Sequence, residues 1–343
     1  MNTQSTPLPT LTRRDSLKLL AMISASAAMP SALLAATRTR SASPLLGWTP
    51  LPISVKGFHL IADLATGGNT LLASHDEQAL LIDTKFASYG PALRADAQTL
   101  NQGNPDLTLI NTHHHGDHTG GNAFIIPHAK DSYAQSNAVA RIQSQIEQAI
   151  GEAKSGPEHF TKNNASKELI ALAQHAADSI GQITNEAVTP EHTVSKSTTI
   201  KHANTPVTLH HFGPGHTDND LVVHFENDNI IHTGDLVFQG LHPFFFPAGG
   251  ATALGWVKSL KATQKLTDKH TQVIPGHGQP GDRSIIQTQI DYLQQLIEQV
   301  QKQIDAGTTK EDTAKMEWDF MDGLGFEGIR ERAIDAVYDE LSN

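Results

Sequence analysis

The chain has 343 residues, of which 38% are hydrophobic and 18% charged, a composition ordinary for a globular protein long enough to bury a core. Its formal net charge of −11 argues against a nucleic-acid substrate, which needs a basic groove. The chain contains no cysteine, which excludes disulfide bonds and thiolate metal ligands.

The first element in chain order is an N-terminal leader. The run Thr12–Lys18 contains Arg13 and Arg14 and precedes an apolar, alanine-rich stretch that ends at about Ala36. This pattern resembles a twin-arginine signal peptide over residues 1–36, and it predicts export by the Tat machinery to the periplasm or the medium. Serine and proline interrupt the stretch, so we expect no membrane anchor after the leader is removed.

A short linker separates the leader from the folded domain. Residues 37–56 are rich in serine, proline and threonine and are interpreted as a linker or a loosely packed N-terminal arm. The domain is expected over residues 57–343. It opens with three short apolar runs separated by turn residues, which predict a β-meander: Phe58–Leu64, Asn69–Ser74 and Ala79–Asp83.

The next strand leads into the most informative motif of the chain. The run Leu107–Thr112 predicts a buried strand, which is followed by His113-x-His115-x-Asp117-His118. His113 and His115 are two residues apart, so they can point to the same side of an extended segment and share one ion. Asp117 and His118 follow a turn and can reach a second ion beside the first.

Three later apolar runs each end in a glycine that is followed at once by a histidine or an aspartate. They are Val207–Phe212 before Gly215-His216, Asn229–Thr233 before Gly234-Asp235, and Thr271–Pro275 before Gly276-His277. Glycine at a strand end lets neighbouring backbone approach closely. Within the first motif, His114 is expected to point away from the ligands.

Helical patterning accounts for most of the remaining chain. A polar, alanine- and glutamine-rich helical insertion is expected over about residues 133–190, with helices at 133–150 and 165–180. Strands return between residues 207 and 233, and a helix follows at 252–266. The C-terminal helices, within about 284–341, are expected at 284–303 and 329–341. The last is interpreted as a core-packing helix, and the oligomeric state stays undetermined.

In this order the motifs resemble those of metallo-β-lactamase-fold hydrolases, over the chain from about Phe58 to the C-terminus. The resemblance implies an α/β (α+β) fold, the four-layer αββα sandwich, with residues 57–343 as the catalytic domain and the metals at one edge between the sheets. It implies a first zinc on His113, His115 and His216 and a second on Asp117, His118 and His277, with Asp235 bridging both. Asp83 would support the ligand loop or, alternatively, cap a turn.

The ligand set indicates the chemistry. Imidazoles and carboxylates suit zinc, two ions per chain, and would also accept iron or manganese. Two cations about 3.5–4 Å apart lower the pKa of a shared water from about 15.7 toward 7, so no serine or cysteine nucleophile is required. Asp117 is expected to orient the nucleophile and to pass a proton to the leaving group. The predicted reaction is hydrolysis of an ester, lactone or amide, including a β-lactam, of a small molecule.

The segment after Asp235 gives the best indication of substrate. Three consecutive phenylalanines cannot all face one core, so the candidate substrate wall consists of Phe238, His242, Phe244, Phe245 and Phe246. The alternative is that these side chains pack the segment onto helices, with His242 as an outer hydrogen-bond donor. True metallo-β-lactamases of the best-known subclass have a cysteine in place of Asp235 and a lysine in place of Phe238. This departure disfavours efficient recognition of a β-lactam carboxylate.

Two other functions are compatible with parts of the motif set. A mononuclear iron oxygenase related to the persulfide dioxygenases would need His113, His216 and Asp235 or a similar subset. Retention of the second ligand group, Asp117, His118 and His277, disfavours this alternative. A non-catalytic metal- or partner-binding module is disfavoured because all seven candidate ligands are present.

Overall fold

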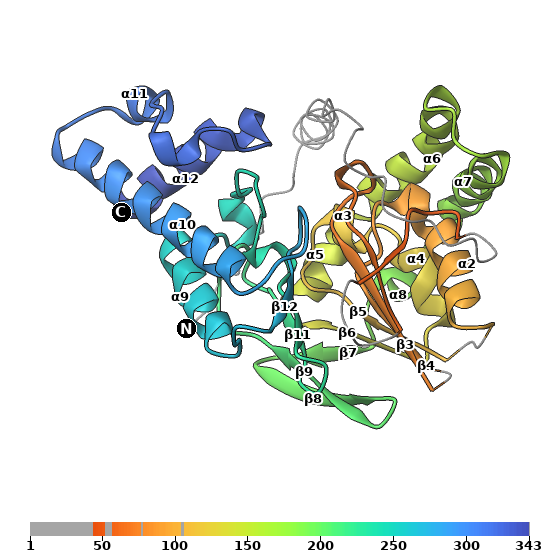
Figure 1. Ribbon diagram of the computed structural model, residues 1–343. Coiled ribbons are helices and arrows are strands. Elements are labelled where there is room, and N and C mark those ends of the chain that lie inside the picture. Colours follow the sequence, from red (N-terminus) through yellow and green to blue (C-terminus); the bar gives the residue numbers. More distant parts are fainter. Residues whose placement is uncertain (1–43, 52–56, 77, 104–105, 343) are drawn as a thin grey trace, which may run out of the picture.

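Two β-sheets form the centre of the molecule, and helices cover the outer face of each (Figure 1). The computed structural model describes residues 44–51, 57–76, 78–103 and 106–342. The predicted leader and the rest of the arm lie outside these ranges. Within them, no helix has the length and apolar composition needed to cross a bilayer.

The first sheet has seven strands that follow one another in chain order. They are β1 (Thr49–Pro50), β2 (Phe58–Ile61), β3 (Thr70–His75), β4 (Gln78–Ile82), β5 (Leu107–Ile110), β6 (Asp131–Gln135) and β7 (His192–Val194). Strands β2 to β4 form the predicted antiparallel meander, whereas β4 to β7 run parallel. Because Ile82 pairs with Ile110, Asp83 and the first ligand motif emerge side by side.

The second sheet has five strands in the order β12-β11-β10-β9-β8. They are β8 (Ser197–His202), β9 (Thr205–His210), β10 (Val222–Phe225), β11 (Ile230–His232) and β12 (Gln272–Ile274). Strands β11 and β12 are parallel neighbours, with His232 paired to Ile274. The segments carrying Asp235 and His277 therefore leave the sheet at the same edge.

The inner faces of the two sheets share one hydrophobic core. Val207 and Leu209 are two residues apart on β9, so their side chains share one face of the strand, and both are fully buried in this core. Phe58 of β2 and Phe225 of β10 meet edge to face, with ring centroids 5.1 Å apart. This contact links the two sheets directly.

Helices form the outer layers on both sides (Figure 1). The first sheet is covered by α2 (Gly90–Leu100), α6 (Ile146–Lys162) and α7 (Lys167–Ser179), with the short helices α3 (Gly116–Thr119), α4 (Asn122–Ile125), α5 (Ala138–Ser144) and α8 (Asn185–Val188). The second sheet is covered by α9 (Ala253–Gln264), α10 (Ser284–Asp305), α11 (Lys310–Ala314) and α12 (Arg330–Ser342). The predicted αββα sandwich is thereby confirmed.

Helix α10 illustrates how the sequence builds an outer layer. Ile286, Ile290, Leu293 and Val300 recur at helical spacing and are all buried, whereas most positions between them are exposed. This amphipathic pattern places one apolar stripe against the second sheet and against α9 and α12.

The predicted start of the helical insertion was wrong. Residues 131–135 form strand β6, which pairs in parallel with β5, and the helices of the insertion begin at Ala138 and end at Val188. Ser132 and Ala134 are buried while Asp131 and Tyr133 are not, so the strand alternates, but five residues are too few for this period to stand out. Strands β7 and β8 and helix α2 were not predicted either.

The described part of the N-terminal arm is packed rather than loose. Asp96 of α2 accepts hydrogen bonds from the backbone N–H groups of Leu45 and Leu46, at 2.7 and 2.8 Å, and from the indole N–H of Trp48, at 3.1 Å. Leu46 is itself buried against α2. Residues 44–51 therefore belong to the domain.

The contact between the sheets predicts a large loss of stability on truncation. Phe225→Ala removes a fully buried ring, so we expect the free energy of unfolding to fall by about 3–5 kcal/mol, measured by urea denaturation of the metal-free protein. Leu254→Ala is the control, because Leu254 is 55% exposed and should change that energy by less than about 0.5 kcal/mol. Equal effects of the two substitutions would contradict this assignment of the core.

Candidate metal centre

The seven predicted ligands converge at one edge between the two sheets. His113, His115, Asp117 and His118 follow β5 of the first sheet, and His216, Asp235 and His277 come from three loops of the second. They form two adjoining groups, His113, His115, His216 and Asp235 in one and Asp117, His118 and His277 in the other. The site therefore exists only when both halves of the sandwich are in place.

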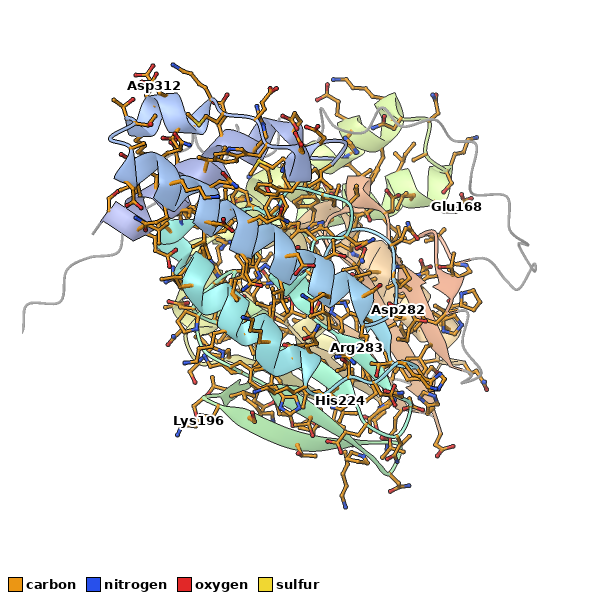
Figure 2. The ribbon with its side chains drawn as sticks, turned by 60° about the vertical axis from the view of Figure 1, so that its left-hand side comes forward. Glu168, Lys196, His224, Asp282, Arg283 and Asp312 are labelled. Carbon is orange, nitrogen blue, oxygen red and sulfur yellow. The ribbon has the colours of Figure 1, made fainter. Side chains whose placement is uncertain are left out.

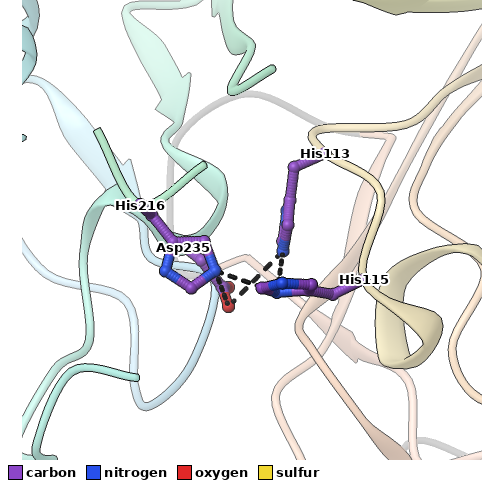
Figure 3. A group of neighbouring side chains, drawn as sticks. All are labelled: His113, His115, His216 and Asp235. Atoms are coloured by element: carbon purple, nitrogen blue, oxygen red, sulfur yellow. Dashed lines mark hydrogen bonds and ion pairs between the residues drawn. The ribbon is translucent and has the colours of Figure 1, made fainter. Parts of the chain in front are cut away.

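The first group is compact (Figure 3). Nδ1 of His115 lies 3.1 Å from Nε2 of His113 and 3.0 Å from Nε2 of His216. Asp235 Oδ2 completes the group at 3.7 Å from His113 Nε2 and 3.4 Å from His216 Nε2. Three ring nitrogens and one carboxylate oxygen thus face a common point.

The second group lies on the other side of Asp235. His277 Nε2 is 3.4 Å from His118 Nε2 and 3.2 Å from Asp117 Oδ2. Asp235 Oδ1 is 3.1 Å from His118 Nε2, and Asp235 Oδ2 is 3.4 Å from His277 Nε2. Asp235 contacts both groups, which is the position that a bridging ligand requires.

Asp83 determines which ring nitrogen faces the site. Its carboxylate accepts hydrogen bonds from the Thr112 backbone N–H and hydroxyl, at 2.8 and 2.7 Å, and from His118 Nδ1, at 2.7 Å. The Thr112 hydroxyl, having donated to Asp83, accepts from His113 Nδ1 at 3.0 Å. Both Nδ1 atoms therefore carry protons, and both Nε2 atoms face the site. Asp83 thus supports the ligand loop and does more than cap a turn.

The donor set fits a metal ion. In the first group, Nε2 of His113, Nδ1 of His115 and Nε2 of His216 meet at about 3 Å. If the imidazoles are neutral, each of these nitrogens needs a hydrogen-bond donor for its lone pair, and one proton shared among them cannot supply all three. One cation at their common point would satisfy all three together with Asp235. In the second group, one carboxylate oxygen of Asp117 and one ring nitrogen each of His118 and His277 lie within 4.8 Å of one another, a donor set that would hold a second ion once the imidazoles release their protons. Nitrogen and oxygen donors without thiolate suit zinc and also accept iron or manganese.

The family follows from the sequence as well as from this geometry. The profile of the Metallo-beta-lactamase superfamily matches residues 64–277, which include all seven ligand candidates. The chain belongs to the metallo-β-lactamase superfamily. Most members of this superfamily are hydrolases, and its proteins usually bind zinc.

Individual relatives are distant. A metallo-beta-lactamase type 2 of Bacteroides fragilis is 21% identical over 234 residues, which are 68% of this chain and 78% of that protein. The sec-alkylsulfatase Pisa1 from Pseudomonas sp. has a TM-score of 0.57 at 16% identity, covering 84% of this chain but only 49% of its own. A metallo-beta-lactamase from Pontibacter korlensis has a TM-score of 0.50 at 20% identity, covering 72% of this chain and 99% of that one. These likenesses show the superfamily fold.

Glycines permit two close approaches in this superfamily site. A Cβ on Gly276 would collide with Oδ1 of Asp235, and a Cβ on Gly68 would collide with the imidazole of His118. Asp235 and His118 therefore each lie against the backbone of a glycine, where any side chain would collide with them. The sequence predicted such a close approach at Gly276, which follows a strand.

A buried lysine that the sequence did not indicate supports the second group. Lys85 is fully buried at a left-handed backbone position, with φ at 62°, and its Nζ donates to the carbonyls of Ile61 and Gly68 at 3.2 and 2.6 Å. The Gly68 N–H in turn donates to the Asp117 carbonyl. Burial lowers the pKa of Lys85 to about 7, even though nearby carboxylates, including Asp117, favour its charged form.

Hydrogen bonds and an ion pair fix the loop that carries His216. Asp220 accepts from the Thr217 N–H and hydroxyl, and Asn219 contacts Nδ1 of His114, which points away from the ligands as predicted. Arg141 of α5 forms a paired ion contact with Asp218, at 3.1 and 2.6 Å. The helical insertion therefore helps to fix this loop through Arg141. Residue spacing in the sequence did not predict this contact.

The predicted substrate wall is only partly present. The half-buried Phe244 and Phe246 lie beside His115, whereas Phe238, which stacks on His277 with centroids 5.1 Å apart, is 5% exposed and belongs to the core. The prediction was wrong for Phe245, which is 1% exposed and packs against Trp256 in the core. The prediction that His242 lines the substrate wall was also wrong.

His242 is fully buried and its contacts lead away from the metal centre. Its two ring nitrogens lie 2.9 Å from the Tyr292 hydroxyl and 3.0 Å from Glu327 Oε2, and neither partner is a ligand candidate. The side chain thus ties its segment to α10 and to the turn before α12. A buried imidazole with both nitrogens occupied in this way acts in packing rather than at the substrate wall.

Charge in the metal-free site is unevenly distributed. Burial lowers the pKa of His115 and of His216 to about 3 and keeps both neutral. Burial also opposes the charged form of His277, but Asp235 and Asp117 outweigh it and raise the pKa of His277 to about 9. The same carboxylates raise the pKa of His118 well above its usual value. The second group therefore holds protons that a metal ion must displace.

Removing the Asp83 carboxylate should weaken the second group most. In Asp83→Asn, His118 loses the acceptor that holds its Nδ1 proton, so we expect a 10–100-fold loss of affinity for the second metal, measured by competition with a chromophoric chelator. Asp96→Asn is a matched control, because Asp96 is also a buried carboxylate but contacts only the arm and not the ligands. Two metals bound at unchanged affinity in Asp83→Asn would contradict the role assigned to Asp83.

The pKa shifts predict that metal binding at the two ligand groups depends differently on pH. His277 holds a proton below about pH 9 in the metal-free protein, so affinity for the second metal should rise between pH 6.5 and 9, by about tenfold per unit for each proton displaced. His115 and His216 are already neutral in this range, so affinity for the first metal should rise less. Calorimetric titration at several pH values measures both, and parallel curves would refute the assignment.

Proposed function

We propose that this protein is an exported binuclear zinc hydrolase that cleaves an ester, lactone or amide bond of a small molecule. The observation that carries the proposal is the pair of adjoining ligand groups sharing Asp235. A mononuclear oxygenase needs one such group, so the assembled second group favours hydrolysis. The leader motif of residues 1–36 supports export to the periplasm.

When bound, two metal ions would supply an activated water and would stabilise negative charge that develops on the substrate. The chain contributes a proton acceptor at the same place. Asp117 is 13% exposed, and His118 and His277 outweigh burial to keep its pKa below the usual range, so it is ionised at neutral pH. In the proposed mechanism its carboxylate would orient the water, accept a proton from it, and pass that proton to the leaving group.

The surroundings favour an apolar substrate. The partly exposed Phe244 lies 5.7 Å from His115 and 6.4 Å from His216, measured between ring centroids. Aromatic surface beside the ligands excludes bulk water and accepts apolar acyl or alkyl groups. Relatives named for β-lactam and sec-alkyl sulfate hydrolysis add both substrate classes to those worth testing.

The proposal is tested on the mature chain purified from the periplasm without added metal. We expect about two zinc ions per chain and turnover of at least one of a lactone, an aryl ester, a chromogenic cephalosporin and a sec-alkyl sulfate. Asp117→Asn should lower kcat by about 10²-fold or more, because it removes a proton acceptor. Asp96→Asn serves again as a buried control and should keep full activity.

Other outcomes would contradict parts of the proposal. One iron per chain with no hydrolysis would favour the oxygenase. Two zincs with full activity in Asp117→Asn would remove the assigned role of Asp117. Retention of the unprocessed chain in the cytoplasm would refute export.

A further inference from the structure

The metal centre can be reached from one side. Of the seven ligand candidates, His115 and Asp117 keep partial exposure, while the others are buried. A substrate that contacts the centre must therefore approach along His115 and Asp117.

Two phenylalanines stand beside this approach. The rings of Phe244 and Phe246 lie 5.7 and 6.3 Å from the His115 ring, and their planes are within 17° of each other. Both stay partly exposed, although Phe245 between them is buried. An aromatic surface left in contact with water forgoes hydrophobic stabilisation, which suits it to hold the apolar part of a ligand.

A fixed positive charge lies on the same aromatic pair. The guanidinium carbon of Arg332 is 5.0 Å from the centroid of Phe244 and 5.8 Å from that of Phe246, within the range of cation–π attraction. Its helix, α12, is anchored on α9, because Glu340 accepts hydrogen bonds from the Thr252 hydroxyl and the Ala253 N–H at 2.5 and 2.6 Å. Arginine stays charged at every physiological pH.

We propose that Phe244, Phe246 and Arg332 form the specificity subsite of the enzyme and that its substrate carries an oxyanion at the end of a short apolar spacer. The inference rests on the proposed hydrolase function. A guanidinium binds carboxylate, sulfate or phosphate through paired N–H donors. Arg332 contacts Phe244, and Phe244 contacts His115, so an apolar spacer would lie along Phe244 between the oxyanion and the bond that is cleaved.

The test compares two substrates that differ in charge. Mono(4-nitrophenyl) glutarate carries a free carboxylate, whereas 4-nitrophenyl valerate has a similar chain without charge. In Arg332→Gln we expect kcat/KM for the glutarate to fall at least tenfold, through a higher KM, and that for the valerate to change less than threefold. Arg332→Lys keeps the positive charge but lacks the paired N–H donors. Its kcat/KM for the glutarate should lie between those of the wild type and Arg332→Gln. Corresponding sulfate- and phosphate-ended esters identify the preferred oxyanion.

Arg283 offers a matched control, since it is exposed and lies at the start of α10 (Figure 2). Arg283→Gln removes the same charge and should change neither substrate's KM. Equal losses for both substrates in Arg332→Gln would show a structural role and overturn the proposal. An unchanged KM for every anionic ester would overturn it as well.

Failure of the hydrolase function is separable from failure of the subsite. If the wild-type enzyme cleaves neither ester, the proposed function fails for this class, and glutarate binding to the zinc-loaded protein is then measured by calorimetry. At least tenfold weaker binding in Arg332→Gln than in both wild type and Arg283→Gln supports the subsite. Equal binding by all three proteins overturns it.

Discussion

The burial of three carboxylates is the constraint on which the rest of the site depends. Asp83, Asp117 and Asp235 lie together between the sheets with little or no exposure, and uncompensated negative charge there is costly. Without metal, raised pKa values of His118 and His277 supply compensating protons. Two metal ions would replace those protons. Folding of the ligand loops, metal affinity and pH are therefore linked in this protein.

The two halves of the sandwich contribute to the centre in different ways. The first sheet supplies a single continuous motif, positioned by Asp83 at the end of the neighbouring strand β4. The second sheet supplies His216, Asp235 and His277 from separate loops, of which the last two adjoin because β11 and β12 are parallel. Phe58 and Phe225 hold the halves together away from the metal ligands. Packing between the sheets and metal binding thus stabilise the same arrangement.

The sequence predicted what depends on local spacing. Every ligand candidate follows a short strand, and the resemblance of the motif order to metallo-β-lactamase-fold hydrolases assigned His113 and His277 to the same centre. Contacts between segments that are distant in the chain produce no spacing pattern in the sequence, so they were not predicted. Lys85 is an unusual residue for a buried left-handed position, and Arg332 of the last helix contacts Phe244, which lies beside His115. Phe245 was misassigned because an alternating segment turns every second side chain into the core.

The central claim is that this chain binds two metal ions on two ligand groups that share Asp235. Diffraction from zinc-loaded crystals, measured above and below the zinc absorption edge, tests it most directly. We expect two anomalous peaks, one bounded by His113, His115 and His216 and the other by Asp117, His118 and His277, with Asp235 touching both. A single peak, with Asp117 and His277 free of metal at saturating zinc, would contradict it.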